Sequence, residues 1–408
     1  MSGAPGAGEA AGRWRVLILL SLAELFGMSL WFSASAVAPL LKAEWGLSDA
    51  SATWLTLSVQ LGFVAGTLAS AVLNLPDVWS PRRLVIGASL LGAAANASLA
   101  LFSHGATSAL GLRFLTGFAL AGVYPPGMKI LASWFRARRG LALGVLVGAL
   151  TLGKAAPYLV NAVFGSAWRR SLLAASGLTL VGAVLVVLFV REGPFAPAAA
   201  RFDLTQVTKV FANRGVRLAS FGYFGHMWEL YAMWTWIPVM LRSSFALRGL
   251  PPAAAEAASF LVIGCGAAGC VLAGLAADRK GRTLVTSLAM AVSGACCVVI
   301  GLCYGGPPLV LLAVAAVWGA SVVADSAQFS AAVTELGDVS YMGTALTLQT
   351  SLGFFLTAIS IDLIPAFLPA LGWRWVFVLL APGPALGVLA MLRLRALPEA
   401  AKIAQGRR

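Results

Sequence analysis

Long apolar runs separated by short polar interruptions dominate this chain of 408 residues. Each run approaches the roughly 20 mainly apolar residues that a helix needs to cross a bilayer. The runs are too long and too continuous for the alternating strands of a membrane barrel. They predict an all-α integral membrane protein with twelve spanning helices, near residues 16–40, 51–73, 84–102, 108–134, 140–163, 171–190, 215–241, 257–277, 283–303, 308–331, 343–367 and 373–392.

The longest polar interruption, near residues 191–217, follows the sixth run and divides six spans from six. It begins with the helix-breaking stretch 193–197, and residues 202–211 then predict a short amphipathic helix on the membrane surface. The pattern predicts three parts: an N-terminal six-helix bundle over 1–190, a linker over 191–214 and a C-terminal six-helix bundle over 215–408.

Three landmarks recur in the same order in both halves. The stretch from Glu24 to Trp31 matches the stretch from Glu229 to Trp236 at an offset of 205, and the Trp-Arg pair at 168–169 recurs at 373–374 with the same offset. Asp77 and Asp278, each followed by basic residues, differ by 201. The order and offsets predict duplicated, pseudo-symmetric halves, which suit rocking of two bundles about a central site.

Composition and charge place the chain in a bilayer. It is 60% hydrophobic and 11% charged, whereas a soluble domain carries roughly 25% charged residues. In the twelve-helix topology, twenty Lys and Arg residues fall on the side of both termini and the central loop, against six on the other side. This positive-inside bias predicts cytoplasmic termini, and it assigns the net charge of +14 to topology rather than to nucleic acid binding. The residue usage favours a bacterial cytoplasmic (inner) membrane.

Two motifs carry a family resemblance. The stretch from Gly274 to Arg282 resembles the loop motif G-x-x-x-D-R-x-G-R of the major facilitator superfamily, and Arg113 with Gly117 resembles that superfamily's second motif. The resemblance implies a secondary transporter that can work as a monomer. It also implies a cytoplasmic gate, formed by Asp278, Arg279 and Arg282 and by a degenerate counterpart with Asp77, Arg82 and Arg83.

The fifth run carries a finer resemblance. Its glycines before Pro157 partly resemble the fifth helix of drug exporters, without their Gly-Pro dipeptide. The stretches at 134–135 and 139–140 and the Gly153–Pro157 spacing are similar to those of bacterial cyanate, nitroimidazole and nitrate-type facilitators.

Basic residues within the spans predict an anion site. Lys154 lies about 21 Å into the fifth run, too deep for easy snorkelling, and a buried ammonium attracts a small carboxylate or another anion. Its alternative is an internal ion pair with Glu24 or another acid. Arg113 could anchor an anion or serve a structural or coupling role. Tyr124, Trp31 and Trp236 complete the predicted substrate site.

Acidic residues within the spans predict proton coupling. Glu24 and Glu229 occupy matching positions and are expected to face each other across the pseudo-axis, where changing water access would let a carboxylate bind and release a proton. His226, one turn before Glu229, could relay protons. Asp325 is expected to pair with Lys154 or Arg113 across the halves. For each Glu, the alternative is a permanent pair with an interior base.

The residues do not suggest an enzyme. We find no phosphate-binding Gly-Lys-Ser/Thr loop and no His/Cys cluster with metal-ligand spacing, and we therefore expect neither metal nor cofactor. The preferred function is proton-coupled transport of a small anion by alternating access, as a symporter or an antiporter. One alternative is a proton-driven exporter of amphipathic drugs or metabolites, and another is a facilitator-like sensor without net transport.

Overall fold

The computed structural model describes residues 7–75, 79–135, 138–165, 167–195, 203–338 and 341–407, and within these ranges every regular element is a helix. Nine helical stretches in this part are long and apolar enough to cross a membrane. One of them, 342–395, contains two crossing segments, because the chain reverses at Gly372. Together with α1 and α12, these segments make up the twelve crossings that the sequence predicts.

The N-terminal half contains the first six crossings. Helices α7 and α8 together form the fourth crossing, and the short helices α2 and α3 continue the first crossing beyond α1. The elements are α1 (Ala7–Met28), α2 (Ser33–Ala36), α3 (Ala38–Trp45), α4 (Asp49–Val72), α6 (Pro81–Phe102), α7 (Ala106–Leu120), α8 (Tyr124–Ala132), α9 (Arg139–Phe164) and α10 (Trp168–Phe189).

The C-terminal half repeats this plan after a linker that contains η1 (Leu204–Gln206) and α11 (Val207–Ala212), where the sequence predicts a surface helix. Helices α15 and α16 together form the tenth crossing. The elements are α12 (Arg214–Ala246), α13 (Pro252–Lys280), α14 (Arg282–Val299), η2 (Ile300–Cys303), α15 (Pro308–Val322), α16 (Ser326–Leu336), α17 (Met342–Trp375), η4 (Val376–Leu380), α18 (Pro382–Arg395) and η5 (Pro398–Gly406).

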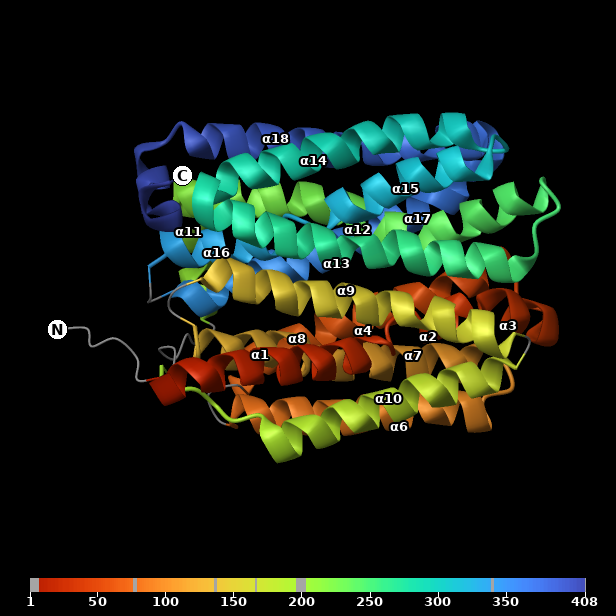
Figure 1. The fold of residues 1–408 in the computed structure, drawn as a ribbon, viewed down its shortest axis with the longest axis horizontal. Helices are drawn as coiled ribbons and strands as arrows, with labels where there is room; N and C mark the ends of the chain where they lie inside the picture. Colours follow the sequence, from red (N-terminus) through yellow and green to blue (C-terminus); the bar gives the residue numbers. More distant parts are fainter. Residues whose placement is uncertain are drawn as a thin grey trace.

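The two halves lie side by side (Figure 1), with the red-to-yellow helices in one half of the view and the green-to-blue helices in the other. The start of α1 and the C-terminal segment η5 lie at the same end of the molecule, which we call the terminal face. The fourth and tenth crossings break at matching positions, over 121–123 and 323–325. The first crossing also breaks, over 29–32, whereas its counterpart α12 is continuous.

A seam of small residues joins the halves where α9 packs on α13. A Cβ atom added to Gly144 would lie 2.5 Å from the Cys270 carbonyl oxygen, and one added to Gly274 would lie 2.5 Å from the Gly140 carbonyl oxygen. Such close approach of two backbones is possible only where side chains are absent. The fifth-run glycines therefore hold the two halves in contact.

This seam predicts a site-specific effect of the smallest possible side chain. Gly144→Ala should lower stability by about 1–3 kcal/mol, because the new methyl group overlaps a backbone carbonyl that cannot rotate away. Thermal unfolding of the purified protein in detergent measures the change. Gly87→Ala is the matched control, since its Cβ meets nothing within 4 Å and should leave stability unchanged or slightly raised. Equal effects of the two substitutions would contradict the seam.

Candidate functional site

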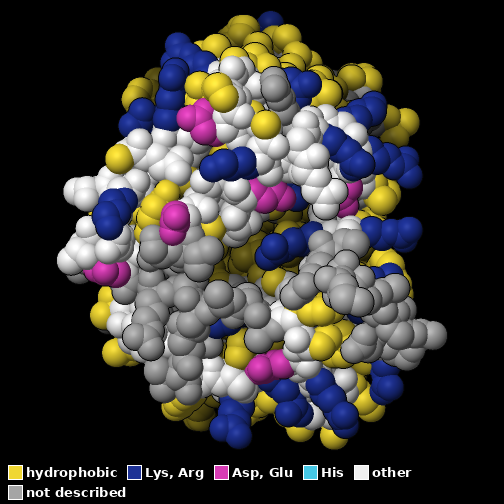
Figure 2. All heavy atoms as spheres, turned by 90° about the vertical axis from the view of Figure 1, so that its left-hand side faces the viewer, with side chains coloured by type: hydrophobic (Ala, Val, Ile, Leu, Met, Phe, Trp, Pro, Cys, Tyr) yellow, Lys and Arg dark blue, Asp and Glu magenta, His cyan; other side chains and the backbone are white. Residues whose placement is uncertain are grey.

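A cavity of about 570 Å³ lies between the two halves. Its wall is formed by α1, α4, α8 and α9 from the N-terminal half and by α12, α16 and α17 from the C-terminal half. Figure 2, which looks onto the terminal face, shows a hollow between the halves with Lys and Arg side chains near its rim. The cavity thus opens on the face that carries the chain ends.

The charged side chains on the cavity wall are all basic. Lys129, Arg139 and Lys154 line it, and no Asp or Glu does so in the part of the chain that the structure describes. All three bases come from the N-terminal half, whereas the C-terminal half contributes hydroxyl groups from α16 and α17. A concave wall with charges of one sign concentrates ions of the opposite sign.

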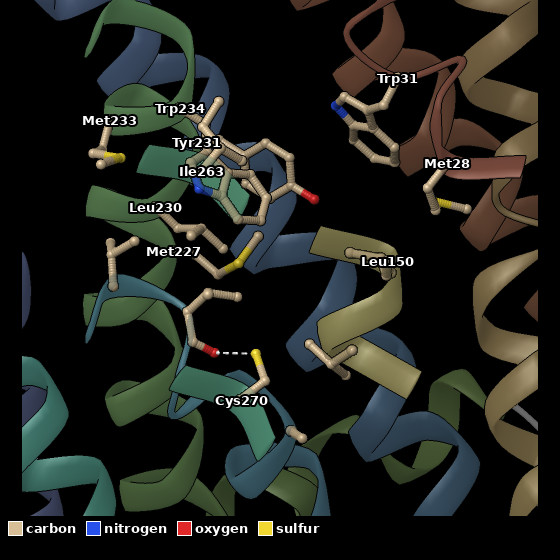
Figure 3. Close-up of a cluster of buried hydrophobic side chains, with 14 of the residues drawn as sticks. Met28, Trp31, Leu150, Met227, Leu230, Tyr231, Met233, Trp234, Ile263 and Cys270 are labelled. Carbon is tan, nitrogen blue, oxygen red and sulfur yellow. Dashed lines mark hydrogen bonds between the residues drawn. The ribbon is translucent and has the colours of Figure 1, made fainter. Parts of the chain in front are cut away.

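Lys154 is surrounded by aromatic rings, and no described acidic side chain forms a salt bridge with it. Its Nζ lies 4.1 Å from the ring centroid of Trp31, 4.5 Å from that of Tyr231 and 5.1 Å from that of Trp234. It also donates a hydrogen bond to the Tyr231 hydroxyl. The π faces stabilise the ammonium electrostatically. Figure 3 shows Tyr231 and Trp234 together on α12, with Trp31 on the facing segment of the other half.

Aromatic side chains from both halves meet beside Lys154. Phe63 and Phe354 have ring centroids 4.3 Å apart, and Trp31 lies 5.0 Å from Phe63, 5.7 Å from Phe354 and 5.4 Å from Tyr231. Trp31 and Phe63 belong to the N-terminal half, and Tyr231 and Phe354 belong to the C-terminal half. This aromatic cluster closes the inner end of the cavity.

Glu24 lies buried behind the cavity wall. Neither carboxyl oxygen has a hydrogen-bond partner among the described residues. The group packs on Gly127, where an added Cβ would lie 2.1 Å from Glu24 Oε1. Lys154 interacts with Glu24 electrostatically, but no salt bridge joins them in the described part of the chain. The predicted alternative of a tight ion pair between the two is therefore not what the structure contains.

Glu229, its counterpart in the repeat, is fully bonded. It accepts hydrogen bonds from Ser293 Oγ at 2.8 Å, Cys297 Sγ at 3.1 Å and Trp318 Nε1 at 2.5 Å. The donors come from α14 and α15 of the same half. The expectation that Glu24 and Glu229 face each other is wrong, because each carboxyl group is directed into its own half.

His226 and Asp325 form a buried pair within the C-terminal half. His226 Nδ1 lies 2.9 Å from Asp325 Oδ1, and both side chains are 1% exposed. The expected pairing of Asp325 with Lys154 or Arg113 is therefore wrong, since the chain break over 323–325 directs Asp325 toward α12. Neither residue lines the cavity.

Arg113 stabilises the broken segment of the first crossing by hydrogen bonds. Its guanidinium donates to the carbonyl oxygens of Leu30 at 2.9 Å, Leu55 at 3.2 Å and Trp31. A broken helix leaves carbonyl groups without partners, and the buried cation satisfies them. Arg113 is fully buried and lies outside the cavity wall, a position that favours its structural role.

The remaining predicted substrate residues separate into two groups. Tyr124 and Trp31 line the cavity. Trp236 instead faces α17, where its Nε1 donates to the Ile361 carbonyl oxygen at 2.9 Å. Sequence reasoning missed the roles of Tyr231 and Arg139, although Tyr231 could have been found because it follows Glu229 in the repeated stretch.

The described gate residues on the terminal face make one polar contact between the halves. Asp278 Oδ2 accepts from the backbone N–H of Leu141 at 3.1 Å, at the N-terminus of α9, where the helix dipole favours a negative charge. Arg282 pairs with Glu335 within its own half, and Arg82 donates to the Val187 carbonyl oxygen at the end of α10.

Three further gate residues complete the predicted set. Arg83 and Arg279 are exposed at the terminal face. Asp77 lies outside the described residues.

Comparison with known proteins agrees with this architecture. The family model described as Major Facilitator Superfamily matches residues 19–361. The chain is 25% identical over 333 residues to a gallate transporter of Pseudomonas putida, covering 72% of each chain. It is 28% identical over 274 residues to the 4-hydroxybenzoate transporter PcaK of Pseudomonas aeruginosa, covering 57% of this chain and 60% of the relative. It is also 29% identical over 237 residues to human monocarboxylate transporter 11, covering 53% and 49%.

The family match spans most of the chain and confirms the resemblance predicted from the loop and fourth-span motifs. The match covers less than two thirds of the length of the second and third relatives. The chain belongs to the Major Facilitator Superfamily: it is a multi-pass membrane protein and a secondary transporter of small molecules, not an enzyme.

Proposed function

We propose that this protein carries a small organic anion across the bacterial cytoplasmic membrane by alternating access, coupled to protons. The observation that carries the proposal is the charge of the cavity wall, where Lys129, Arg139 and Lys154 are basic and none of the described lining residues is acidic. Such a wall attracts anions and repels cations. It therefore favours anion transport over export of amphipathic cations.

An aromatic monocarboxylate fits the closed end of the cavity best. The ammonium of Lys154 has three N–H donors, of which one goes to Tyr231. A carboxylate can accept the others while its ring packs on Trp31 and Phe354 in the offset or edge-to-face arrangements that aromatic pairs prefer. The named substrates of two relatives, gallate and 4-hydroxybenzoate, belong to this chemical class.

Substrate binding would exchange one stabilisation of Lys154 for another. Without substrate, the π faces of three rings stabilise the ammonium, by roughly 2 kcal/mol for a desolvated cation–π contact. A hydrogen bond to a charged group contributes about 1.5–3 kcal/mol. One cation–π contact and one hydrogen bond to the carboxylate therefore stabilise the ammonium by comparable amounts. Exchange of ring contacts for a carboxylate, and the reverse exchange on release, then changes the free energy of Lys154 little.

The proton site of this proposal is Glu24 alone. A carboxyl group without hydrogen-bond donors is poorly stabilised as an anion and well suited to carry a proton. Its electrostatic interaction with Lys154 would link proton binding to anion binding. Glu229, which has three donors, serves instead to fix α12 against α14 and α15. The protein would act as a monomer with its termini in the cytoplasm.

Removing the charge of Lys154 should strongly reduce anion transport. In proteoliposomes with an imposed pH gradient, Lys154→Met should reduce the initial rate of 4-hydroxybenzoate uptake at least tenfold, because the lost charge-assisted hydrogen bond is worth about 1.5–3 kcal/mol. Lys209→Met, at an exposed linker position, is the matched control and should transport normally. Full uptake by Lys154→Met, or uptake of benzylammonium in place of 4-hydroxybenzoate, would contradict the proposal.

The two glutamates should differ when each is changed to glutamine. Glu24→Gln loses no hydrogen bond, so it should keep its thermal stability and its substrate exchange but lose accumulation driven by a pH gradient. Glu229→Gln places an amide among three donors and should lower stability by about 1–3 kcal/mol. Thermal unfolding and flux assays on both variants measure this contrast. Gradient-driven accumulation by Glu24→Gln would remove Glu24 from the coupling mechanism.

A further inference from the structure

The basic residues of the cavity wall are not gathered at one point. Arg139 and Lys154 lie on the same face of α9, fifteen residues apart, which corresponds to about 22 Å along the helix. Between them, Leu143, Val147 and Leu150 line the cavity. A one-ring acid is far too short to contact both charges. An anion bound at Lys154 therefore makes no contact with Arg139.

Hydroxyl groups face this outer part of the cavity from the opposite half. Ser326, Ser330 and Thr334 recur every four residues on α16, so they lie along one face of that helix, and all three line the cavity. Arg139 and Lys129 line the same cavity near its opening, at the end of α8 and the start of α9. Guanidinium, ammonium and hydroxyl donors together are the groups that bind a carboxylate.

The acid nearest in sequence to this hydroxyl face is already paired. Glu335 accepts from Arg282 Nε at 2.9 Å, from Arg282 Nη2 at 2.7 Å and from the backbone N–H of Ala404 at 3.0 Å. Arg139 interacts with Glu335 only at longer range, and it has no ion pair within 4 Å among the described residues. Its positive charge is thus not neutralised by a direct protein partner in this part of the structure.

We infer that the cavity contains a second anion-binding station at its opening, formed by Arg139 with Ser330 and Thr334. The inference rests on the proposed function, because its ligand is the carboxylate of the transported acid. The guanidinium fork binds the carboxylate through two parallel hydrogen bonds, and Lys129 adds positive potential. Ser330 donates from the other half, and Thr334 does so once its hydroxyl turns away from the Ala331 carbonyl oxygen, to which it donates at 2.7 Å in this structure. The anion passes from Lys154 to Arg139 across the apolar stretch of α9, so release proceeds in two steps.

The test uses a single reactive thiol at the second station. Ser330→Cys is introduced into a background in which the two partly exposed cysteines, Cys265 and Cys303, are changed to serine. In detergent, the anionic reagent sulfonatoethyl methanethiosulfonate should modify Cys at 330 faster than the cationic trimethylammonium analogue, by about tenfold after correction for their intrinsic rates. Arg139→Gln should abolish most of this preference. A Ser48→Cys control at the opposite end should show no response to Arg139→Gln.

Substrate protection separates this inference from the proposed function. With Lys154→Met added, 4-hydroxybenzoate should still slow modification at 330, and Arg139→Gln should remove the protection. Protection that requires Lys154 would leave the proposed function standing and overturn the second station. A charge preference without protection in either background would also overturn it, since a positive potential alone is not a binding site. Absence of transport of any organic anion by the unmodified protein would overturn the proposed function itself.

Discussion

A buried ammonium in a membrane protein must be stabilised by something other than water. In this protein the stabilising groups are the rings of Trp31, Tyr231 and Trp234 and the Tyr231 hydroxyl. Lys154 and Trp31 belong to one half, and Tyr231 and Trp234 belong to the other. The need to surround one charge therefore draws the two halves together at the closed end of the cavity, and the aromatic cluster of Phe63 and Phe354 extends that contact.

Helix α9 combines this polar requirement with close packing. One face packs Gly144 and Gly148 on the backbone of α13 and Gly140 on the Asp278 side chain, and the neighbouring face carries Arg139 and Lys154 into the cavity. The glycine face determines how closely the two halves approach, and the other face gives the cavity between them its positive charge. A substitution on either face should therefore affect transport, through packing in one case and through substrate affinity in the other.

The sequence was sufficient to predict the fold because bilayer crossing leaves a long and local signal. The run near 140–163 appears as α9 over Arg139–Phe164, and the run near 84–102 appears as α6 over Pro81–Phe102. Lys154 could also be identified as a candidate binding residue, since the number of residues between it and the start of the run gives its depth in the bilayer. Breaks within crossings were not predictable in this way, because the break over 29–32 depends on Arg113, which approaches from α7.

The two glutamates show where sequence symmetry stops being informative. Glu24 and Glu229 occupy equivalent positions in the repeat, but within the described ranges only Glu229 meets donors, and those donors are supplied by Ser293, Cys297 and Trp318 on other helices. Partners of this kind are separated from Glu229 by 64 residues or more, so no local pattern reveals them. The same limitation hid the pairing of His226 with Asp325.

The transported acid should bind Lys154 through its carboxylate. The most direct measurement is rotational-echo double-resonance NMR between 4-hydroxybenzoate labelled with ¹³C at its carboxylate and protein labelled with ¹⁵N at the side chains of its six lysines. Binding at Lys154 predicts ¹³C–¹⁵N dephasing from a carboxylate carbon whose oxygen lies about 2.8 Å from Nζ, and the loss of this dephasing in Lys154→Met. Bound substrate without dephasing, or dephasing that persists in Lys154→Met, would contradict it.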